Sequence, residues 1–212
     1  MLVQDLSDIE RDALTELVNI GVSGAATRLR AMVGSEVRLT VPVINIMSPA
    51  DAAQSLVTFN LESLIAVRQA FGGRLSGQAM LLFNALDAQT LVRAVLGEDY
   101  SQEDYDELHD DTLGEVGNIL LLGLLSTIGS MLSLTFDVEI PTVEATHNGQ
   151  VFHEDGGRVI MLIHVDFSVG EILTRGYFAL ALGLGSFEVL RDIVAAFIKD
   201  VIGEDPDAAL PG

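Results

Sequence analysis

The sequence predicts an α+β protein that folds as a single domain, in which two long helices pack against a mostly antiparallel sheet. Two observations lead to this prediction. Long stretches with apolar residues at helical spacing are followed by short stretches in which apolar and polar residues alternate, as they do in strands. The same order of stretches also occurs twice. We therefore expect two repeats, about residues 1–99 and 100–201, related by an approximate two-fold axis.

A pattern of an acid, a second acid and an amide occurs in both halves at a constant separation. The differences 111 − 12, 115 − 16 and 118 − 19 all equal 99, which relates Asp12 to Asp111, Glu16 to Glu115 and Asn19 to Asn118. Other identical pairs at this separation include Leu14/Leu113, Gly24/Gly123, Pro42/Pro141, Gly77/Gly176 and Leu81/Leu180. Such spacing without net insertion indicates an internal duplication of a helix-strands-helix unit.

The first half begins with a helix. Ser7 followed by Glu10 is a capping-box signature, and the apolar spacing continues to about Val33 before Gly34 ends the helix. Residues 37–46 then alternate as a strand, in which Pro42 indicates an edge strand or a bulge.

Further elements complete this half and repeat in the second. We expect a loop or short helix over 48–56, strands over 64–70 and 78–83 with Gly72-Gly73 as their turn, and a helix over 88–95. For the second half we expect a helix over about 106–134, strands near 136–145, 158–167 and 172–182, and a helix over 186–202. Residues 203–212 are expected to form a disordered tail.

The composition indicates which classes of partner the chain can bind. Eleven basic against 31 acidic residues give a formal charge of −20, which disfavours nucleic acid and anionic membranes and favours a protein whose contact face carries Lys or Arg. Residues 98–111 hold eight carboxylates and are interpreted as a solvated linker whose later acids stabilise the next helix, or as a flap that attracts a basic partner. The chain has no cysteine, and no signal peptide is evident, so we expect a cytoplasmic location.

One stretch has the length and polarity of a membrane span. Residues 116–136 contain no charged residue. The alternative is a helix buried on most sides, which we favour because the equivalent helix of the first half carries Arg28 and Arg30. No membrane association is therefore expected.

The repeated acids and amides should form two polar stripes. Positions 12, 16 and 19 are spaced i, i+4 and i+7, so their side chains share one helix face, as do those of 111, 115 and 118. A single Glu-x-x-Asn is uninformative, but two copies at equivalent places need a reason, because Asn is a mediocre helix former. We interpret both stripes as candidate sites.

These residues carry a resemblance to a known family. ERDALTELVNIGVSGAATRL, VRLTVPVI and DDTLGEVGNILL resemble the signature helices of the CheC, CheX and FliY family of chemotaxis phosphatases, and most closely those of CheC, which keeps the pattern in both halves. The resemblance implies a CheC-like fold over nearly the whole chain. It also implies hydrolysis of the aspartyl phosphate of a CheY-type response regulator in chemotaxis or related two-component signalling.

The resemblance also implies roles for the matching residues. Glu16 and Glu115 would contact the regulator's lysine, and Asn19 and Asn118 would orient the attacking water, with Asp12 and Asp111 in support. A carboxamide can hold a water in line with phosphorus, and phosphoryl transfer asks little more of a protein than orientation and charge neutralisation. We expect no cofactor of the chain's own and a Mg²⁺ ion on the partner. His109, His147, His153 and His164 lack metal-ligand spacing.

The first copy departs from the family pattern. Val18 stands where the family often has Gly before the Asn, whereas Gly117 precedes Asn118. We expect a bulkier Val18 to crowd a docking regulator, which ranks the second site first. The alternative function is a non-catalytic binding module that docks on a receiver domain, on the deamidase CheD or on a flagellar switch protein.

Overall fold

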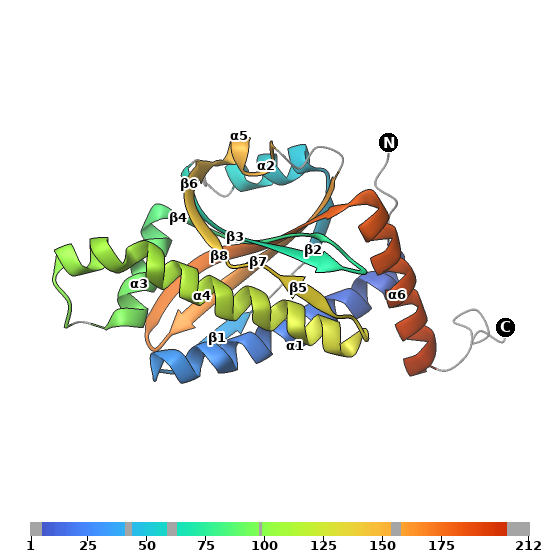
Figure 1. Cartoon of the computed structure of the whole chain (residues 1–212), viewed down its shortest axis with the longest axis horizontal. Coiled ribbons are helices and arrows are strands. Elements are labelled where there is room, and N and C mark those ends of the chain that lie inside the picture. The colour runs from blue at the N-terminus through green and yellow to red at the C-terminus, as the bar shows by residue number, and fades with distance from the viewer. Residues whose placement is uncertain (1–5, 41–43, 59–62, 98, 154–157, 203–212) are drawn as a thin grey trace.

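A curved antiparallel sheet divides the molecule into two layers of helices (Figure 1). The computed structural model describes residues 6–40, 44–58, 63–97, 99–153 and 158–202. The strands are β1 (Val37–Thr40), β2 (Ile44–Met47), β3 (Ser63–Gly73), β4 (Gly77–Asn84), β5 (Phe136–Val138), β6 (Thr142–His147), β7 (Arg158–Val169) and β8 (Ile172–Gly183). They follow the spatial order β1-β7-β8-β4-β3-β5, with β2 also on β7 and β6 also on β3.

Helices cover both faces of this sheet. They are α1 (Asp8–Val33), α2 (Pro49–Thr58), α3 (Ala85–Leu96), α4 (Gln102–Met131), α5 (Asn148–Val151) and α6 (Leu184–Ile202). The larger core lies between the sheet and α1, α3, α4 and α6, and a smaller core lies under α2 and α5 on the opposite face. This arrangement confirms the predicted α+β class with two long helices on an antiparallel sheet.

The two long helices cross at small residues. A Cβ atom on Gly21 would lie 2.7 Å from Leu124 Cδ1, and one on Gly123 would lie 2.9 Å from the Cβ of Ala25. Only glycine at these positions lets α1 and α4 approach this closely. The crossing buries one side of each helix and leaves the opposite sides to face solvent.

Both long helices start at capping boxes. Ser7 and Glu10 form the predicted box at α1, and Ser101 and Asp104 form another at α4. The second box starts α4 at Gln102, about one turn earlier than predicted, so most of the acidic segment belongs to the helix rather than to a linker. Acids in a first helical turn are stabilised by the helix dipole and free backbone N–H groups.

A one-residue slip interrupts the pairing of the β5–β6 edge with β3. Val138 pairs with Phe71 and Thr142 pairs with Arg68, so three residues of the edge stand opposite two of β3. Such a slip is a β-bulge, which leaves backbone groups outside the regular ladder. Glu139 lies in this bulge.

The opposite edge slips by the same amount. Thr40 pairs with Asp166 and Ile44 with Ile163, so four steps along the edge match three along β7. The predicted strand over 37–46 is therefore two strands at an edge of the sheet. Pro42, for which we predicted an edge or a bulge, lies outside the described residues, as does the predicted tail over 203–212.

Other boundaries differ from the predictions in small ways. Residues 49–58 form a helix, and the β3–β4 turn follows Gly73 instead of containing it. Gly73 has φ of 128° and its Cβ would lie 2.6 Å from the Thr135 carbonyl oxygen, so this glycine serves a close approach at the strand end. Each half runs through helix, two strands, helix, two strands and helix. The common origin of the halves stays a prediction.

The apolar stretch in α4 lies within the fold. By length and composition α4 could cross a membrane, and 56% of its most apolar 18-residue window is buried in the structure. Gly117 and Leu124 pack against β3 and α1 respectively. Burial against other parts of the protein accounts for the apolar composition, as the Arg-bearing counterpart helix suggested.

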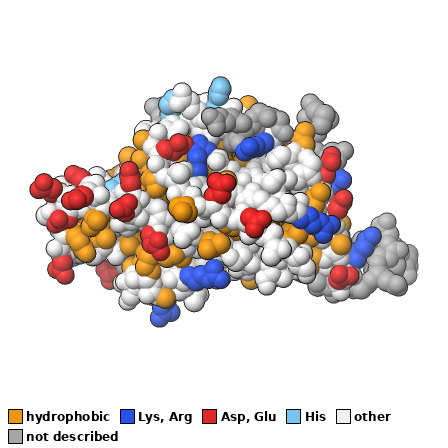
Figure 2. Space-filling model, viewed as in Figure 1, with side chains coloured by type: hydrophobic (Ala, Val, Ile, Leu, Met, Phe, Trp, Pro, Cys, Tyr) orange, Lys and Arg blue, Asp and Glu red, His pale blue; other side chains and the backbone are white. Residues whose placement is uncertain are grey.

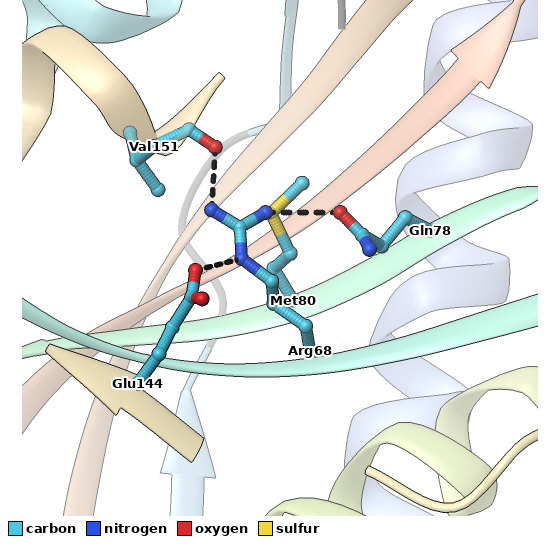
Figure 3. A network of polar contacts seen from close by, with 5 residues as sticks. All are labelled: Arg68, Gln78, Met80, Glu144 and Val151. Atoms are coloured by element: carbon cyan, nitrogen blue, oxygen red, sulfur yellow. Dashed lines mark hydrogen bonds and ion pairs between the residues drawn. The ribbon is translucent and has the colours of Figure 1, made fainter. Parts of the chain in front are cut away.

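Arg68 ties the second layer to the sheet (Figure 3). Its guanidinium donates to Gln78 Oε1 at 2.9 Å, to the Val151 carbonyl oxygen at 2.7 Å and to a carboxylate oxygen of Glu144. These contacts join β3 to β4, β6 and α5. Only 15% of the Arg68 side chain is exposed, so its charge depends on these partners.

Replacing Arg68 should weaken the fold, whereas a matched surface arginine should not. We expect Arg68→Met to lower the free energy of unfolding by about 2 kcal/mol, because Gln78 and the Val151 carbonyl lose a buried donor. Arg38→Met, at a side chain 72% exposed, should change it by less than about 0.5 kcal/mol. Urea unfolding measures both, and equal effects of the two substitutions would contradict this account.

Candidate functional site

The two predicted stripes have the same exposure pattern. Asp12 and Glu16 are exposed and Asn19 is half-buried on α1. On α4, Asp111 and Glu115 are likewise exposed and Asn118 is half-buried. In each stripe the acids are exposed to solvent and the amide is partly buried, where neighbouring elements can contact it.

The second stripe lines a groove between α4 and the bulged sheet edge. The groove measures about 340 Å³ and is lined by Asp110, Asp111, Gly114, Glu115, Asn118, Ile140, Pro141 and Val143. The structure thus brings all three predicted residues of this copy together. Ile140 is 89% exposed in the bulge, which places an apolar side chain beside the carboxylates.

Asn118 is held from below by a residue that sequence reasoning missed. Gln69 Nε2 donates to Asn118 Oδ1 at 3.1 Å and to the Glu139 carbonyl oxygen at 2.9 Å. Gln69 is 2% exposed, on the side of β3 that faces α4. The bulge supplies this acceptor, because Glu139 leaves the regular pairing with β3 at this point.

A sequence signal for Gln69 existed. The alternate residues of β3 that face the long helices are Ile65, Val67, Gln69 and Phe71, so one polar residue interrupts an apolar row. A buried polar side chain in such a row needs a hydrogen-bonding partner. Which partner it has could not be read from the sequence, because the register of α4 over β3 is a tertiary feature.

Gly117 sets the distance between α4 and β3. A Cβ atom on Gly117 would collide with Val67 Cγ1 and lie 3.1 Å from Val67 Cβ. Glycine therefore lets the helix settle onto the strand, and the next residue, Asn118, comes within hydrogen-bonding distance of Gln69. The glycine before this Asn serves packing below the site.

The prediction about Val18 was wrong in its physical reason. Val18 is fully buried in the core, so it cannot crowd a docking partner. The first copy differs in another way. Asp12 and Glu16 line an apolar groove of about 350 Å³ with Ile9, Ala13, Leu17, Met131, Phe197 and Ile198, and Asn19 is not among the lining residues. Across the described residues, no hydrogen bond from another side chain or backbone group fixes the Asn19 amide.

Negative charge gathers at the N-terminal end of α4 (Figure 2). Glu103, Asp104, Asp106, Glu107, Asp110 and Asp111 are all exposed there. Hydrogen bonds from the Ser101 side chain and backbone lower the pKa of Asp104. Because the second groove continues from this acidic region, it presents a negative approach to any partner.

The described part of the chain shows no converging set of metal ligands. Within residues 6–40, 44–58, 63–97, 99–153 and 158–202, no three His, Asp or Glu side chains lie close enough together to hold an ion. His109 instead contacts Asp110 at 2.8 Å, and His164 stacks on Tyr177. Whether the chain acts without a metal of its own stays a prediction.

Comparison with protein families finds two matches. The model of the chemotaxis phosphatase CheX matches residues 65–164, which include the second stripe. The model of the CheC-like family matches residues 9–46, which include the first.

Two characterised relatives come from Bacillus subtilis. The flagellar motor switch phosphatase FliY is 24% identical over 217 residues, which cover 99% of this chain and 54% of FliY. The chain thus spans about half of that relative's length. The CheY-P phosphatase CheC is 25% identical over 155 residues, which cover 70% of this chain and 72% of CheC.

A solved structure shares the fold. The crystal structure of Thermotoga maritima FliY superposes with a TM-score of 0.72 at 17% identity, over 92% of this chain and all of that one. At this level of identity the likeness establishes the fold and leaves the chemistry open.

Two glycines near the second groove should respond differently to alanine. We expect Gly117→Ala to lower the free energy of unfolding by about 1–2 kcal/mol, because the added Cβ collides with Val67. Gly114→Ala should raise it by about 0.5–1 kcal/mol, since its Cβ would meet Val143 at an ordinary 3.7 Å and alanine favours the helix. Thermal and urea unfolding measure both. Stabilisation by Gly117→Ala would show that α4 and β3 are not in close contact.

Proposed function

We propose that the chain acts as the CheC, CheX and FliY proteins that it resembles, and hydrolyses the aspartyl phosphate of a CheY-type response regulator. The relative CheC is named for action on CheY-P, which supports this substrate class. The observation that carries the proposal is the second groove, where Glu115 and Asn118 lie together and Asn118 is oriented by Gln69.

Asn118 has the donors and acceptors that the reaction needs. Its Oδ1 accepts one hydrogen bond from Gln69 and keeps a second lone pair, which can accept from a water. A water held in this way turns its own lone pair toward phosphorus. The Nδ2 group faces away from Gln69 and can donate to the phosphoryl group. Asn118 therefore positions the water and does not act as a base.

Charge complementarity supports the docking step. Glu115 would contact the lysine of the receiver, and Asp111 would strengthen the negative field around that contact. Ile140 would meet an apolar patch on the receiver face. The Mg²⁺ ion and the lysine that neutralise the phosphoryl group would both belong to the partner. A CheY-type partner also implies action in the cytoplasm.

The first copy is proposed as a weaker site. Glu16 and Asp12 are exposed as their counterparts are, but no side chain in the described part of the chain orients the Asn19 amide. An unrestrained amide must lose conformational freedom in the transition state, which costs rate.

Phosphate release from a CheY-type receiver charged with acetyl phosphate tests the proposal. We expect the wild-type chain to accelerate release, Asn118→Ala to lower this acceleration at least about tenfold, and Asn19→Ala to lower it less. The double variant should leave only the receiver's own decay.

Asn45→Ala is the matched control. Asn45 is exposed on β2, and its side chain lies on the sheet face opposite α1 and α4. It should keep wild-type activity. If the receiver binds but Asn118→Ala does not change its dephosphorylation rate, the chain is a binding module. If wild-type protein leaves the decay of the cognate receiver unchanged, the proposed activity is wrong.

A further inference from the structure

Gln69 is a buried polar residue whose hydrogen-bond pattern dictates the orientation of Asn118. Both hydrogens of Gln69 Nε2 are used, one for the Glu139 carbonyl oxygen and one for Asn118. A backbone carbonyl can only accept, so the Gln69 NH₂ group must face it. Asn118 then has to present its oxygen inward, and its NH₂ group points away from β3.

We propose that Gln69 is a positioning residue that holds Asn118 ready for hydrolysis, an inference that rests on the proposed function. The bulge at Glu139 orients Gln69, and Gln69 orients Asn118. A pre-oriented amide loses little freedom when it takes up the attacking water, so the barrier falls relative to a free Asn side chain. Gln69 does not touch the reacting atoms and is not a catalytic residue.

The side-chain oxygen of Gln69 argues against a purely structural role. Gln69 Oε1 is buried and accepts no hydrogen bond from any of the described residues. An unsatisfied buried acceptor weakens a fold, so an apolar residue of similar size would serve stability better at this place. The apolar neighbours Val67 and Phe71 in the same row show what the core otherwise uses. The glutamine is explained by what it does for Asn118.

The sheet face toward α1 shows no equivalent of Gln69 in the described residues. α1 contacts β1, whose core-facing side chains Val37 and Leu39 are apolar. The side chains of β7 that face the long helices are Val159, Met161, Ile163, Val165, Phe167 and Val169, all apolar. None of them can donate to Asn19. The proposal therefore predicts that the two copies differ in turnover because only the second Asn is held in place, whether or not both bind a receiver.

The decisive experiment isolates the second site in an Asn19→Ala background. There, Gln69→Leu should lower kcat for receiver dephosphorylation by about fivefold to tenfold, the effect of losing one orienting hydrogen bond. KM should stay the same, because the groove and its carboxylates remain. Gln69→Glu keeps the shape but can only accept, so Asn118 must reverse its amide and kcat should fall at least as far.

Two further measurements distinguish a positioning role of Gln69 from general damage to the fold. They are the thermal midpoint and the rate in an Asn118→Ala background. Gln69→Leu should leave the thermal midpoint close to that of wild type, because removing the unsatisfied oxygen offsets the loss of the two donated hydrogen bonds. In an Asn118→Ala background it should leave the residual rate unchanged. Gln78→Leu, at a glutamine on the opposite face of the same sheet, should lower stability without lowering kcat. A lower midpoint together with lost activity in both backgrounds would overturn the proposal.

A measurement without turnover keeps this inference apart from the proposed function. The NMR order parameter of the Asn118 side-chain NH₂ group should fall to below about 0.6 in Gln69→Leu, the range of flexible groups. If wild type shows no phosphatase activity, the proposed function fails while this readout still tests the contact. If wild type is active and Gln69→Leu changes neither kcat nor the order parameter, Gln69 has no positioning role.

Discussion

The close contact of α4 with β3 at Gly117 and Val67 is the constraint on which the second site depends. The absence of a side chain at Gly117 lowers the helix onto the strand. This brings Asn118 within 3.1 Å of Gln69, while the bulge at Glu139 provides the carbonyl that fixes the glutamine. Packing, a strand irregularity and a buried amide thus act together to orient the half-buried side chain of Asn118.

The same contact explains why the two copies of one pattern differ. Asp12, Glu16 and Asn19 repeat the residues and the exposure of the second stripe, yet in the described part of the chain no side chain holds Asn19 by a hydrogen bond. Identical pattern residues at the surface do not ensure that the buried residues supporting them are also identical. The likeness to Thermotoga maritima FliY establishes the fold. Under the proposed function, the residues beneath each stripe determine which copy is better prepared for catalysis.

The sequence was sufficient for much of the fold. Helical spacing and the Ser7–Glu10 box located α1 to within a residue, and the strands were found within a few residues because their alternation is strong. The start of α4 was missed because the acidic composition of residues 98–111 suggested a linker, although Ser101 and Asp104 carried a capping signal. The capping box at Ser101 starts the helix within the acidic segment, despite a composition that is typical of a linker.

The site was predictable only in its exposed part. Constant spacing singled out the acids and amides as candidates, but Val18 was misjudged, although its spacing from Leu14 and Leu17 places it on the buried face of α1. Gln69 lies 49 residues from Asn118, and their contact depends on the crossing of a helix and a bulged strand. Such tertiary contacts cannot be derived from local patterns alone.

In the proposed function, the outward face of Asn118 meets the phosphorylated aspartate of a receiver. NMR titration with a CheY-type receiver carrying beryllofluoride, a stable mimic of aspartyl phosphate, tests it most directly. The account predicts that the Asn118 side-chain NH₂ resonances shift with the charged receiver, and less with the uncharged one, with smaller shifts at Asn19. Shifts confined to surfaces away from α4 and the β5–β6 edge, with Asn118 unaffected, would contradict it.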